Sequence, residues 1–357
     1  MCFVHYCFAC LYGNVYKSMS LYIMKMCYNG ERNYQFKEKI IMLFDVLSNV
    51  LEEYQIIVLG ILFAWVSTLI ALKCEFKFLP QDQGRAFAVN GELSKGKIRG
   101  VGLIMVVCFI ISSILFLPIS KEYIIYLILL FAMMLSGYLD DAAKTPWSDY
   151  KKGLIDFVIS LVAVVVFVTN NDTTIYLFNY SLDIPKAVYI ILGIILLWVS
   201  VNVTNCSDGV DGLCSSLSII TVFSIAIIFR SQMGAYSNYS YMLIGVLLAY
   251  LYFNTSPSTM LMGDAGSRAI GFFIALIAMK SLHPLSFIPL AIVIIIDGGL
   301  GLVKVFLLRF LKIHILKNTR TPIHDEMRKN RGWSDTQVVY RFMAIQIVVS
   351  VIWSMFI

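Results

Sequence analysis

The sequence contains few charged residues for its length. Asp, Glu, Lys and Arg together make up 14% of the 357 residues, whereas 59% of the residues are hydrophobic. A typical soluble domain is about one quarter charged and cannot hide so much apolar surface, which excludes the soluble fold classes. The mean hydropathy of +0.80 and the long apolar runs instead predict an all-α polytopic membrane protein.

Several signatures of known chemistries are missing as well. The eight cysteines have no paired spacing, which argues against a disulfide framework or a zinc site. The chain has no glycine-rich phosphate loop and no serine-nucleophile motif. Its basic residues are divided among separate loops without a nucleic-acid motif, so no nucleic-acid partner is expected. An enzyme built from this chain would therefore depend on carboxylates and a metal ion such as Mg²⁺.

Ten apolar segments are predicted to form transmembrane helices, because about 20 apolar residues suffice to cross a bilayer. The segments are 55–73, 101–120, 123–139, 154–170, 187–204, 212–230, 240–255, 268–283, 285–310 and 338–357. Lys and Arg cluster in alternate loops, so the positive-inside bias places the loops around 73–99, 144–152 and 309–331 in the cytoplasm. With ten spans, both ends of the transmembrane domain then lie outside.

The beginning of the chain is predicted to stand apart from this domain. Residues 1–45 form an N-terminal segment and residues 46–357 a single transmembrane domain. Residues 1–40 match no targeting pattern. They are either a peripheral segment or, as we favour, a stretch that precedes the true translation start, for example at Met42. Because they carry no motif, we expect them to be dispensable.

Two adjacent carboxylates stand at the end of an apolar run. Asp140 and Asp141 directly follow the third predicted span, and three lysines come next: Lys144, Lys151 and Lys152. Carboxylates near hydrocarbon are costly and usually mark an ion or substrate path. The lysines can hold phosphate. The pattern predicts metal and phosphate chemistry at the surface of the bilayer.

A polar loop joins the fifth and sixth spans. It contains two Asn, two Asp and two Gly in eleven residues, among them Asn202, Asn205, Asp208, Gly209 and Asp211. Asp and Asn can bind ribose, base edges or a cation, and Gly permits close approach of a ligand to the backbone. The alternative is a capped turn with Asp208 as the N-cap of the next helix. The sequence alone leaves both interpretations open.

Further polar positions follow later in the chain. Asn254 ends the seventh span, and Asp264 is the only carboxylate between Asp211 and Asp297. Glycines near Asp264 suggest a crowded loop that Mg²⁺ or a phosphate approaches, although a helix N-cap is the alternative. Of the four histidines, only His324 lies in a dense polar cluster. It is a candidate catalytic residue, but a lone histidine is more often structural.

These motifs resemble those of the polyprenyl-phosphate N-acetylhexosamine-1-phosphate transferases. GYLDDAAK resembles the family's aspartate-pair motif, NCSDGVDGL its N-x-x-D-G-x-D-G-L loop, and FNTSP followed by MGDAGS the next motif. TPIH, followed by GW and VVYRF, resembles the region that marks the branch acting on UDP-MurNAc-pentapeptide. The resemblance runs from about residue 50 to the C-terminus, with the motifs in the same order.

The resemblance implies a fold, a reaction and a location. It implies ten transmembrane helices with both ends outside, and a cytoplasmic active site in the bacterial plasma membrane. The implied reaction transfers phospho-MurNAc-pentapeptide from UDP-MurNAc-pentapeptide to undecaprenyl phosphate and gives lipid I and UMP, with Mg²⁺ as the cofactor. The expected partners are these two substrates and the lipid bilayer, and a homodimer is left open.

The family's functional residues can be carried over by position. Asp140 and Asp141 match the paired catalytic aspartates, Asp264 the aspartate that binds Mg²⁺, and His324 the first histidine of a catalytic triplet. We assign Asp140 to deprotonation of the lipid phosphate, and Asp141 together with Asp264 to the metal. The residues expected to bind substrate are Lys97, Lys144, Lys151, Lys152, Asn202, Asn205, Asp208, Gly209, Asp211 and Asn254.

The chain departs from the family pattern at the histidine triplet, which here reads His324-Asp325-Glu326. Carboxylates would repel a diphosphate, so these two are expected to face basic neighbours instead. The candidates are Arg320, Arg328 and Lys329.

Two other functions remain to be weighed. The altered triplet keeps open a sister reaction, the transfer of GlcNAc-1-phosphate from UDP-GlcNAc to undecaprenyl phosphate. A transporter is disfavoured, because transporters place ionisable groups near the bilayer midplane. Here the acidic residues lie mostly in the predicted cytoplasmic loops, with Asp297 as the main exception.

Overall fold

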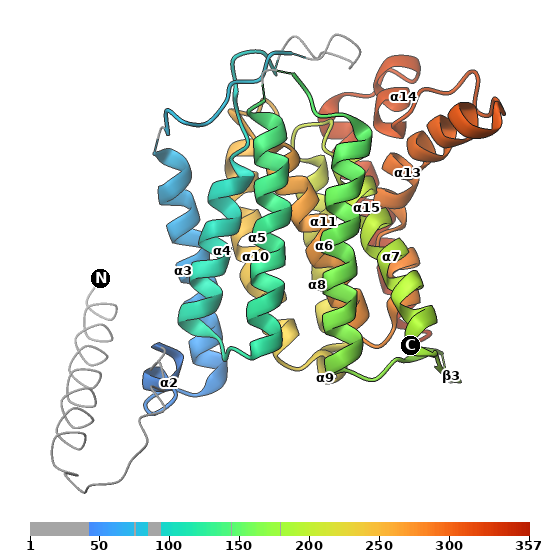
Figure 1. Cartoon of the computed structure of the whole chain (residues 1–357). Helices are drawn as coiled ribbons and strands as arrows, with labels where there is room; N and C mark the ends of the chain where they lie inside the picture. The colour runs from blue at the N-terminus through green and yellow to red at the C-terminus, as the bar shows by residue number, and fades with distance from the viewer. Residues whose placement is uncertain (1–42, 75, 85–93, 144, 179) are drawn as a thin grey trace, which may run out of the picture.

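The described chain forms a bundle of long helices with a small β-hairpin at one end (Figure 1). The computed structural model describes residues 43–357 except 75, 85–93, 144 and 179. The predictions for the N-terminal segment up to Met42 and for Lys144 lie outside these residues.

Each of the ten predicted spans contains a helix. The long helices are α3 (Glu53–Lys73), α4 (Gly102–Phe116), α5 (Lys121–Asp141), α6 (Asp149–Asn170), α7 (Lys186–Cys206), α8 (Leu213–Ile228), α10 (Ala235–Asn254), α11 (Gly263–Lys280), α13 (Ile292–Phe306) and α15 (Asp335–Ser354). The short ones are α2 (Leu43–Leu47), α9 (Arg230–Met233), η2 (Pro284–Ser286), α12 (Phe287–Leu290), η3 (Leu307–Leu311) and α14 (Ile323–Asn330). In the described part of the chain, the five helices α3, α5, α6, α7 and α15 are long and apolar enough to cross a membrane. The number of ten spans and the orientation of the two ends stay predictions.

The ninth predicted span, 285–310, is not a straight helix. Residues Pro284–Leu290 and Ile292–Leu311 meet at an angle of 89°. Prolines in the first part remove backbone donors, and the break falls at Ala291, whose φ of −126° and ψ of 19° lie outside the helical region. Apolar composition predicted a helix here but not its bend.

The outer surface of the bundle suits a hydrocarbon solvent. Ile70 on α3, Ile128 on α5 and Ile191 on α7 are each about 60% exposed and belong to a large set of exposed apolar side chains. Monomeric soluble proteins rarely expose contiguous apolar patches of this extent. The exposed surface therefore agrees with the membrane class expected from composition.

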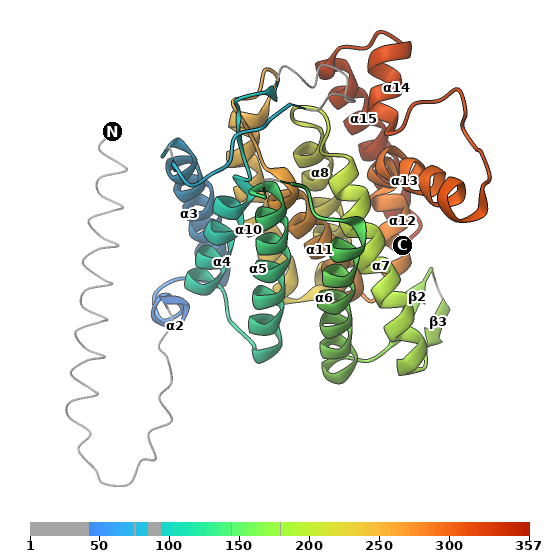
Figure 2. The same cartoon turned by 45° about the horizontal axis from the view of Figure 1, so that its top comes forward.

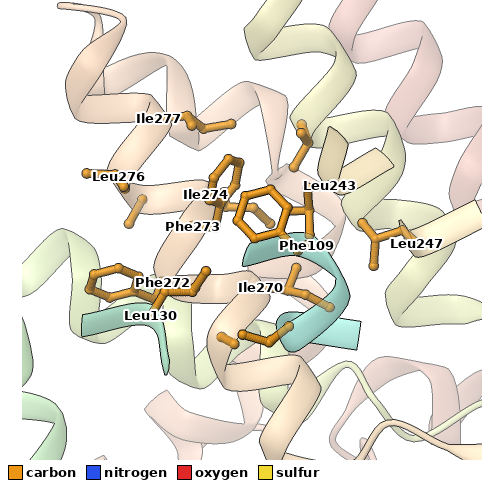
Figure 3. Close-up of a cluster of buried hydrophobic side chains, with 14 of the residues drawn as sticks. Phe109, Leu130, Leu243, Leu247, Ile270, Phe272, Phe273, Ile274, Leu276 and Ile277 are labelled. Carbon is orange, nitrogen blue, oxygen red and sulfur yellow. The ribbon is translucent and has the colours of Figure 1, made fainter. Parts of the chain in front are cut away.

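Helix α11 forms the centre of the bundle. Every residue of α11 except Asp264 is buried, and the helix packs against α4, α5, α7 and α8. Phe109 of α4 and Phe273 of α11 meet edge to face, with their ring centroids 5.4 Å apart (Figure 3). The basic residues Arg268 and Lys280 of α11 are buried as well, and each forms an ion pair with a neighbouring helix.

Two glycines let the start of α11 approach its neighbours. A Cβ on Gly102 would meet the backbone of Gly266, and a Cβ on Gly137 would meet the backbone carbonyl of Asp264. Membrane helices approach most closely where small residues face each other. The beginning of α11 is therefore held against α4 and α5, close to the end of α5 at Asp141.

The described residues form two short sheets, one of which connects distant segments. Strand β1 (Ile98–Arg99) pairs in parallel with β4 (Met260–Leu261), which joins the first loop to the residues just before α11. Strands β2 (Thr174–Leu177) and β3 (Tyr180–Asp183) form an antiparallel hairpin. The hairpin lies at the opposite end of the bundle from α14 in both views (Figures 1 and 2). The polar loops of the site thus gather at the α14 end.

Candidate active site

The two aspartates at the end of α5 have different partners. Asp140 forms an ion pair with Lys152 and accepts a hydrogen bond from the backbone N–H of Trp147 at 2.8 Å. Asp141 accepts a hydrogen bond from Nε of Arg99 at 2.8 Å. Because neighbours on a helix point about 100° apart, such a division was predicted. The surroundings of the two carboxylates differ accordingly, while their separate catalytic roles stay predictions.

Asp264 lies in the first turn of α11 and faces neighbouring elements. Its Oδ1 is 3.3 Å from Nη2 of Arg99, and its Oδ2 is 3.7 Å from Nζ of Lys152. The side chain of Asn205 also hydrogen-bonds to it. The N-cap position of α11 is Met262, so the interpretation of Asp264 as a helix N-cap is wrong. Its carboxylate instead joins four elements of the site.

Arg99 lies at the centre of the acidic cluster, although it was not among the predicted site residues. Its Nε, Nη1 and Nη2 atoms bond to Asp141, Asp82 and Asp264 at 2.8, 2.9 and 3.3 Å. Burial lowers the pKa of Arg99, but the charges of Asp141 and Asp264 outweigh it and raise the pKa above its ordinary value. Arg99 is therefore a permanent cation between three carboxylates.

Asp82 anchors this cation from the loop before β1. Its buried carboxylate also accepts hydrogen bonds from the N–H of Gly84 at 2.7 Å and the hydroxyl of Ser94 at 2.9 Å. Burial raises the pKa of Asp82, but these bonds together with Arg99 hold it below its usual value. Asp82 is thus an ionised and well-fixed partner of Arg99.

Of the three predicted phosphate-binding lysines, Lys152 reaches the carboxylates. It lies within ion-pair distance of both Asp140 and Asp264. Lys151, one residue earlier on α6, places its ammonium 3.4 Å from the ring centroid of Trp147 instead. Adjacent residues on a helix point in different directions, which explains the division.

Asp211 and Lys97 meet where three loops come together. The two carboxylate oxygens of Asp211 accept hydrogen bonds from the hydroxyl and the N–H of Ser258, each at 2.8 Å. Nζ of Lys97 donates to the Ser258 hydroxyl at 2.9 Å and lies 3.6 Å from Asp211. Both predicted residues thus belong to one polar cluster, and Ser258 is an addition to it.

The loop between α7 and α8 is not the capped turn considered from sequence. The N-cap position of α8 is Gly212, with a φ of 83°, and not Asp208. The backbone N–H of Asp208 bonds to the carbonyl of Asn205 at 3.1 Å. Only glycine adopts such a φ freely, so Gly212 sets the direction in which α8 leaves the site.

Two predicted substrate-binding asparagines bond to backbone groups. Nδ2 of Asn202 donates to the carbonyl of Trp198 at 2.8 Å. Asn254 is buried, accepts from the N–H of Gly212 at 2.9 Å and donates to the carbonyl of Met260 at 3.0 Å. Asn254 therefore holds two loops of the site together. Substrate binding by either residue stays a prediction.

His324 contacts the loop after α7 and pairs with Asp297 in α13. Its Nδ1 is 2.8 Å from Oδ2 of Asp297, and its backbone N–H donates to Oδ1 at 2.7 Å. A Cβ on Gly209 would meet the imidazole, so the ring packs directly on that glycine. Burial lowers the pKa of His324, but the Asp297 charge outweighs it and raises the pKa above 6.5.

The two carboxylates after His324 face polar neighbours, as expected. Asp325 forms an ion pair with Arg328 at 3.4 Å. Glu326 accepts hydrogen bonds from the backbone N–H of Arg320 at 2.8 Å and from Nδ2 of Asn330 at 2.7 Å. The prediction is confirmed for Asp325, whereas Glu326 contacts Arg320 through its backbone rather than its charge.

A second ion pair between α6 and α11 lies one helical turn beyond the pair of Lys152 and Asp264, and it was not predicted from the sequence. Arg268 on α11 pairs with Asp156 on α6, and both side chains are buried. They follow Asp264 and Lys152 by four residues, so the two helices carry two successive ion pairs. The sequence offered a signal for this pair, because Arg268 and Asp156 are ionisable residues within apolar segments, where a charge is costly.

Asp141 and Asp264 fit a magnesium ion that is shared with substrate. Mg²⁺ bound with phosphates usually takes one or two carboxylates and completes its shell with water and phosphate oxygens. Within the described residues, no group of three or more His, Cys, Asp or Glu side chains could hold a metal ion. The two aspartates nevertheless bond to one guanidinium, which shows that their oxygens converge.

The acidic site lies in a part of the chain that is similar to a glycosyl transferase family. The model of glycosyl transferase family 4 matches residues 123–282, which include Asp140, Asp141 and Asp264.

Curated relatives identify the branch. The phospho-N-acetylmuramoyl-pentapeptide-transferase of Treponema pallidum (strain Nichols) is 37% identical over 297 residues, which cover 77% of this chain and 82% of the relative. The enzyme of that name from Caldanaerobacter subterraneus subsp. tengcongensis is 30% identical over 262 residues, covering 69% of this chain and 80% of the relative. The chain belongs to the phospho-N-acetylmuramoyl-pentapeptide-transferase family, which confirms the resemblance seen in its motifs.

Proposed function

We propose that this protein transfers phospho-MurNAc-pentapeptide from UDP-MurNAc-pentapeptide to undecaprenyl phosphate, with lipid I and UMP as products. The observation that carries the proposal is the convergence of Asp141, Asp264 and Lys152 at one end of the helical bundle. The names of the curated relatives support the same substrate. Undecaprenyl phosphate is a lipid, so an acceptor site at the end of membrane helices suits it.

The reaction is a displacement at phosphorus. An oxygen of the lipid phosphate attacks the phosphorus that carries the sugar, the bond from that phosphorus to the bridging oxygen breaks, and UMP leaves with the bridging oxygen. Catalysis of such transfers rests on positioning and on stabilisation of negative charge. Mg²⁺ held by Asp141 and Asp264 would neutralise the diphosphate and the leaving phosphate.

Residues of the chain supply the acceptor side of the site. Lys152 lies between Asp140 and Asp264 and provides a positive charge for the incoming lipid phosphate. A phosphate ester has a second pKa of about 6, so most acceptor molecules are already ionised at neutral pH. Asp140 removes the remaining proton and orients Lys152.

The sugar nucleotide is bound by the loops before β1, after α7 and after α10. Lys97, Asp211 and Ser258 form one cluster, and His324 lies against Gly209. Asp297 holds Nδ1 of His324, and Nε2, which lies 3.9 Å from Oδ1 of Asp325, donates a hydrogen bond to the substrate in this proposal. The pyrophosphate then lies between this cluster and the carboxylates that bind the metal.

The site is proposed to face the cytoplasm of a bacterial cell from its plasma membrane. The segments between α3 and α4 and between α5 and the start of α6 are rich in basic residues, and such segments stay on the cytoplasmic side. UDP-linked sugars are made in the cytoplasm, so this orientation gives the enzyme access to its donor.

Turnover by the purified protein decides between the two sugar nucleotides. Protein in lipid bilayers with Mg²⁺ and undecaprenyl phosphate receives either UDP-MurNAc-pentapeptide or UDP-GlcNAc, and UMP release is measured. We expect UMP with the first donor and none above background with the second. UMP release from UDP-GlcNAc alone would contradict the proposed substrate.

A further inference from the structure

Arg99 occupies the place that a metal ion would take. Its guanidinium donates to Asp141 at 2.8 Å and to Asp264 at 3.3 Å, and these are the two carboxylates proposed for Mg²⁺. The two aspartates come from helices that are far apart in sequence. In the structure, the guanidinium of Arg99 lies between them and, together with Lys152 beside Asp264, screens their repulsion.

A metal ion and Arg99 cannot both hold these oxygens in the observed arrangement. Like charges a few ångströms apart repel strongly where water is partly excluded. The side chain of Arg99 is 17% exposed and that of Asp141 only 2% exposed, so solvent screens this contact weakly. Metal binding therefore requires the guanidinium to move away from Asp141 and Asp264.

Such a movement is confined to the side chain. The backbone N–H of Arg99 donates to the carbonyl of Pro80 at 2.8 Å, and the residue belongs to β1, which pairs with β4. Its Nη1 also bonds to Asp82 at 2.9 Å. Asp82 is itself held by the N–H of Gly84 at 2.7 Å. When Arg99 leaves the metal carboxylates, the bond to Asp82 keeps it in the site.

Once it has moved away from Asp141 and Asp264, the guanidinium of Arg99 has N–H groups that can donate hydrogen bonds to a ligand. Arginine carries five N–H groups in a planar fork that fits phosphate oxygens in pairs. One N–H of Arg99 stays on Asp82, and the others become free when the bonds to Asp141 and Asp264 break. A metal-bound diphosphate brings acceptor oxygens to the same place at the same moment.

We propose that Arg99 is a diphosphate-binding residue that also serves as the counter-ion of the metal carboxylates before substrate binds. On binding of the metal and the sugar nucleotide, Arg99 exchanges Asp141 and Asp264 for oxygens of the diphosphate and keeps its bond to Asp82. The inference rests on the proposed function, because it takes the diphosphate of that donor as the ligand.

The exchange is tested first with the metal alone. Binding of Mn²⁺ to the full-length protein, without nucleotide, is measured by electron paramagnetic resonance for the wild type, Arg99→Gln and Arg309→Gln. Arg309 pairs with Asp149 on the exposed surface and serves as the matched control. We expect Arg99→Gln to bind Mn²⁺ about tenfold more tightly, because a competing like charge is gone. Arg309→Gln should match the wild type.

If folded Arg99→Gln binds Mn²⁺ as tightly as the wild type or more weakly, Arg99 and the metal ion do not compete for Asp141 and Asp264, and the proposal is overturned. Arg99→Lys provides a second arm, because lysine keeps the charge but lacks the planar fork. Arg99→Lys should bind Mn²⁺ with wild-type affinity. Because it keeps the positive charge of the cluster, it can be tested even if Arg99→Gln does not fold. Mn²⁺ binding by Arg99→Lys that is tenfold weaker than in the wild type would also contradict the exchange.

Kinetics test the diphosphate contact. With saturating Mg²⁺, Arg99→Lys should raise the KM for UDP-MurNAc-pentapeptide about tenfold, the worth of a lost bidentate phosphate contact, and leave the KM for undecaprenyl phosphate unchanged. An unchanged KM for the donor overturns the diphosphate role. If the wild type releases no UMP from this donor, the proposed function fails, whereas the Mn²⁺ comparison still decides the exchange of Arg99.

Discussion

Asp264 illustrates how one side chain can connect several elements of the site. Its carboxylate contacts Arg99 from β1, Lys152 from α6 and Asn205 from α7, and it is proposed to bind the metal. With two cationic partners at the proposed metal site, Asp264 is expected to contribute to both metal affinity and turnover.

Asp264→Asn should lower UMP release by at least about 100-fold while the protein still folds, because the amide cannot replace a charged metal ligand. UMP release and thermal unfolding are measured together, with Asp149→Asn as the control, since Asp149 forms an exposed ion pair with Arg309. Wild-type turnover by Asp264→Asn would exclude its role at the metal.

The His324–Asp297 pair makes stability depend on pH. The folded-state pKa of His324 is raised above 6.5, so the stabilisation is fully present below pH 6.5 and is lost as the pH rises through the folded-state pKa. Asp297→Asn removes the charge, and we expect a loss on the order of 2 kcal/mol at acidic pH. The difference in thermal unfolding between wild type and Asp297→Asn should narrow with rising pH, and a difference that widens would contradict the assignment.

In helix α14, His324 is proposed to act on the substrate, whereas the next residue, Asp325, is not. His324→Ala should reduce turnover sharply, on the order of 100-fold, the usual scale for a group acting in proton transfer or substrate polarisation. Asp325→Ala should mainly lower stability, because the nearest cation to its carboxylate is Arg328 in the same helix, at 3.4 Å, whereas Nε2 of His324 is 3.9 Å away. If folded Asp325→Ala loses as much activity as His324→Ala, the loop has a different catalytic arrangement.

Close packing of α5 against α11 positions the acidic cluster. A Cβ on Gly137 would meet the backbone of Asp264, whereas nothing lies within 4 Å of a Cβ on Gly153 in α6. Gly137→Ala should therefore push the helices apart, cost on the order of 2 kcal/mol and reduce UMP release. Gly153→Ala should be neutral or slightly stabilising, since alanine favours helix. Equal unfolding temperatures for the two variants would show that the helix contact is less strict than the geometry implies.

The whole molecule has a polar end with the site and an opposite end with the β2–β3 hairpin. If the basic loops are cytoplasmic, the hairpin lies outside the cell. Tyr180 in the hairpin is 79% exposed, and Cys74 at the end of α3 is exposed near the site end. These two positions therefore report the orientation.

In a variant without other cysteines, Tyr180→Cys should react with a membrane-impermeant maleimide in intact cells. Cys74 alone should react only after the membrane is permeabilised. The reverse pattern would invert the orientation, and labelling of both in intact cells would contradict the separation of the two ends.

The membrane class and the order of the helices could be predicted from the sequence. Hydropathy acts over about 20 consecutive residues, so local composition is enough to place each apolar helix. The paired aspartates and the polar loops were also visible, because charged residues next to apolar runs are costly without a purpose. The bend at Ala291 was not predicted, because hydropathy does not record backbone geometry, although Pro284 and Pro289 before it were visible in the sequence.

The partners within the site were decided only by the tertiary structure. Arg99 and Asp264 are 165 residues apart, and they meet because β1 pairs with β4 and glycines bring α11 against α4 and α5. Likewise, His324 pairs with Asp297, which is 27 residues away in the sequence. The sequence by itself determined a membrane enzyme with carboxylates and bases near one surface, because hydropathy and charge are local properties. Which carboxylate faces which base depends on helix packing, and packing is a property of the whole chain.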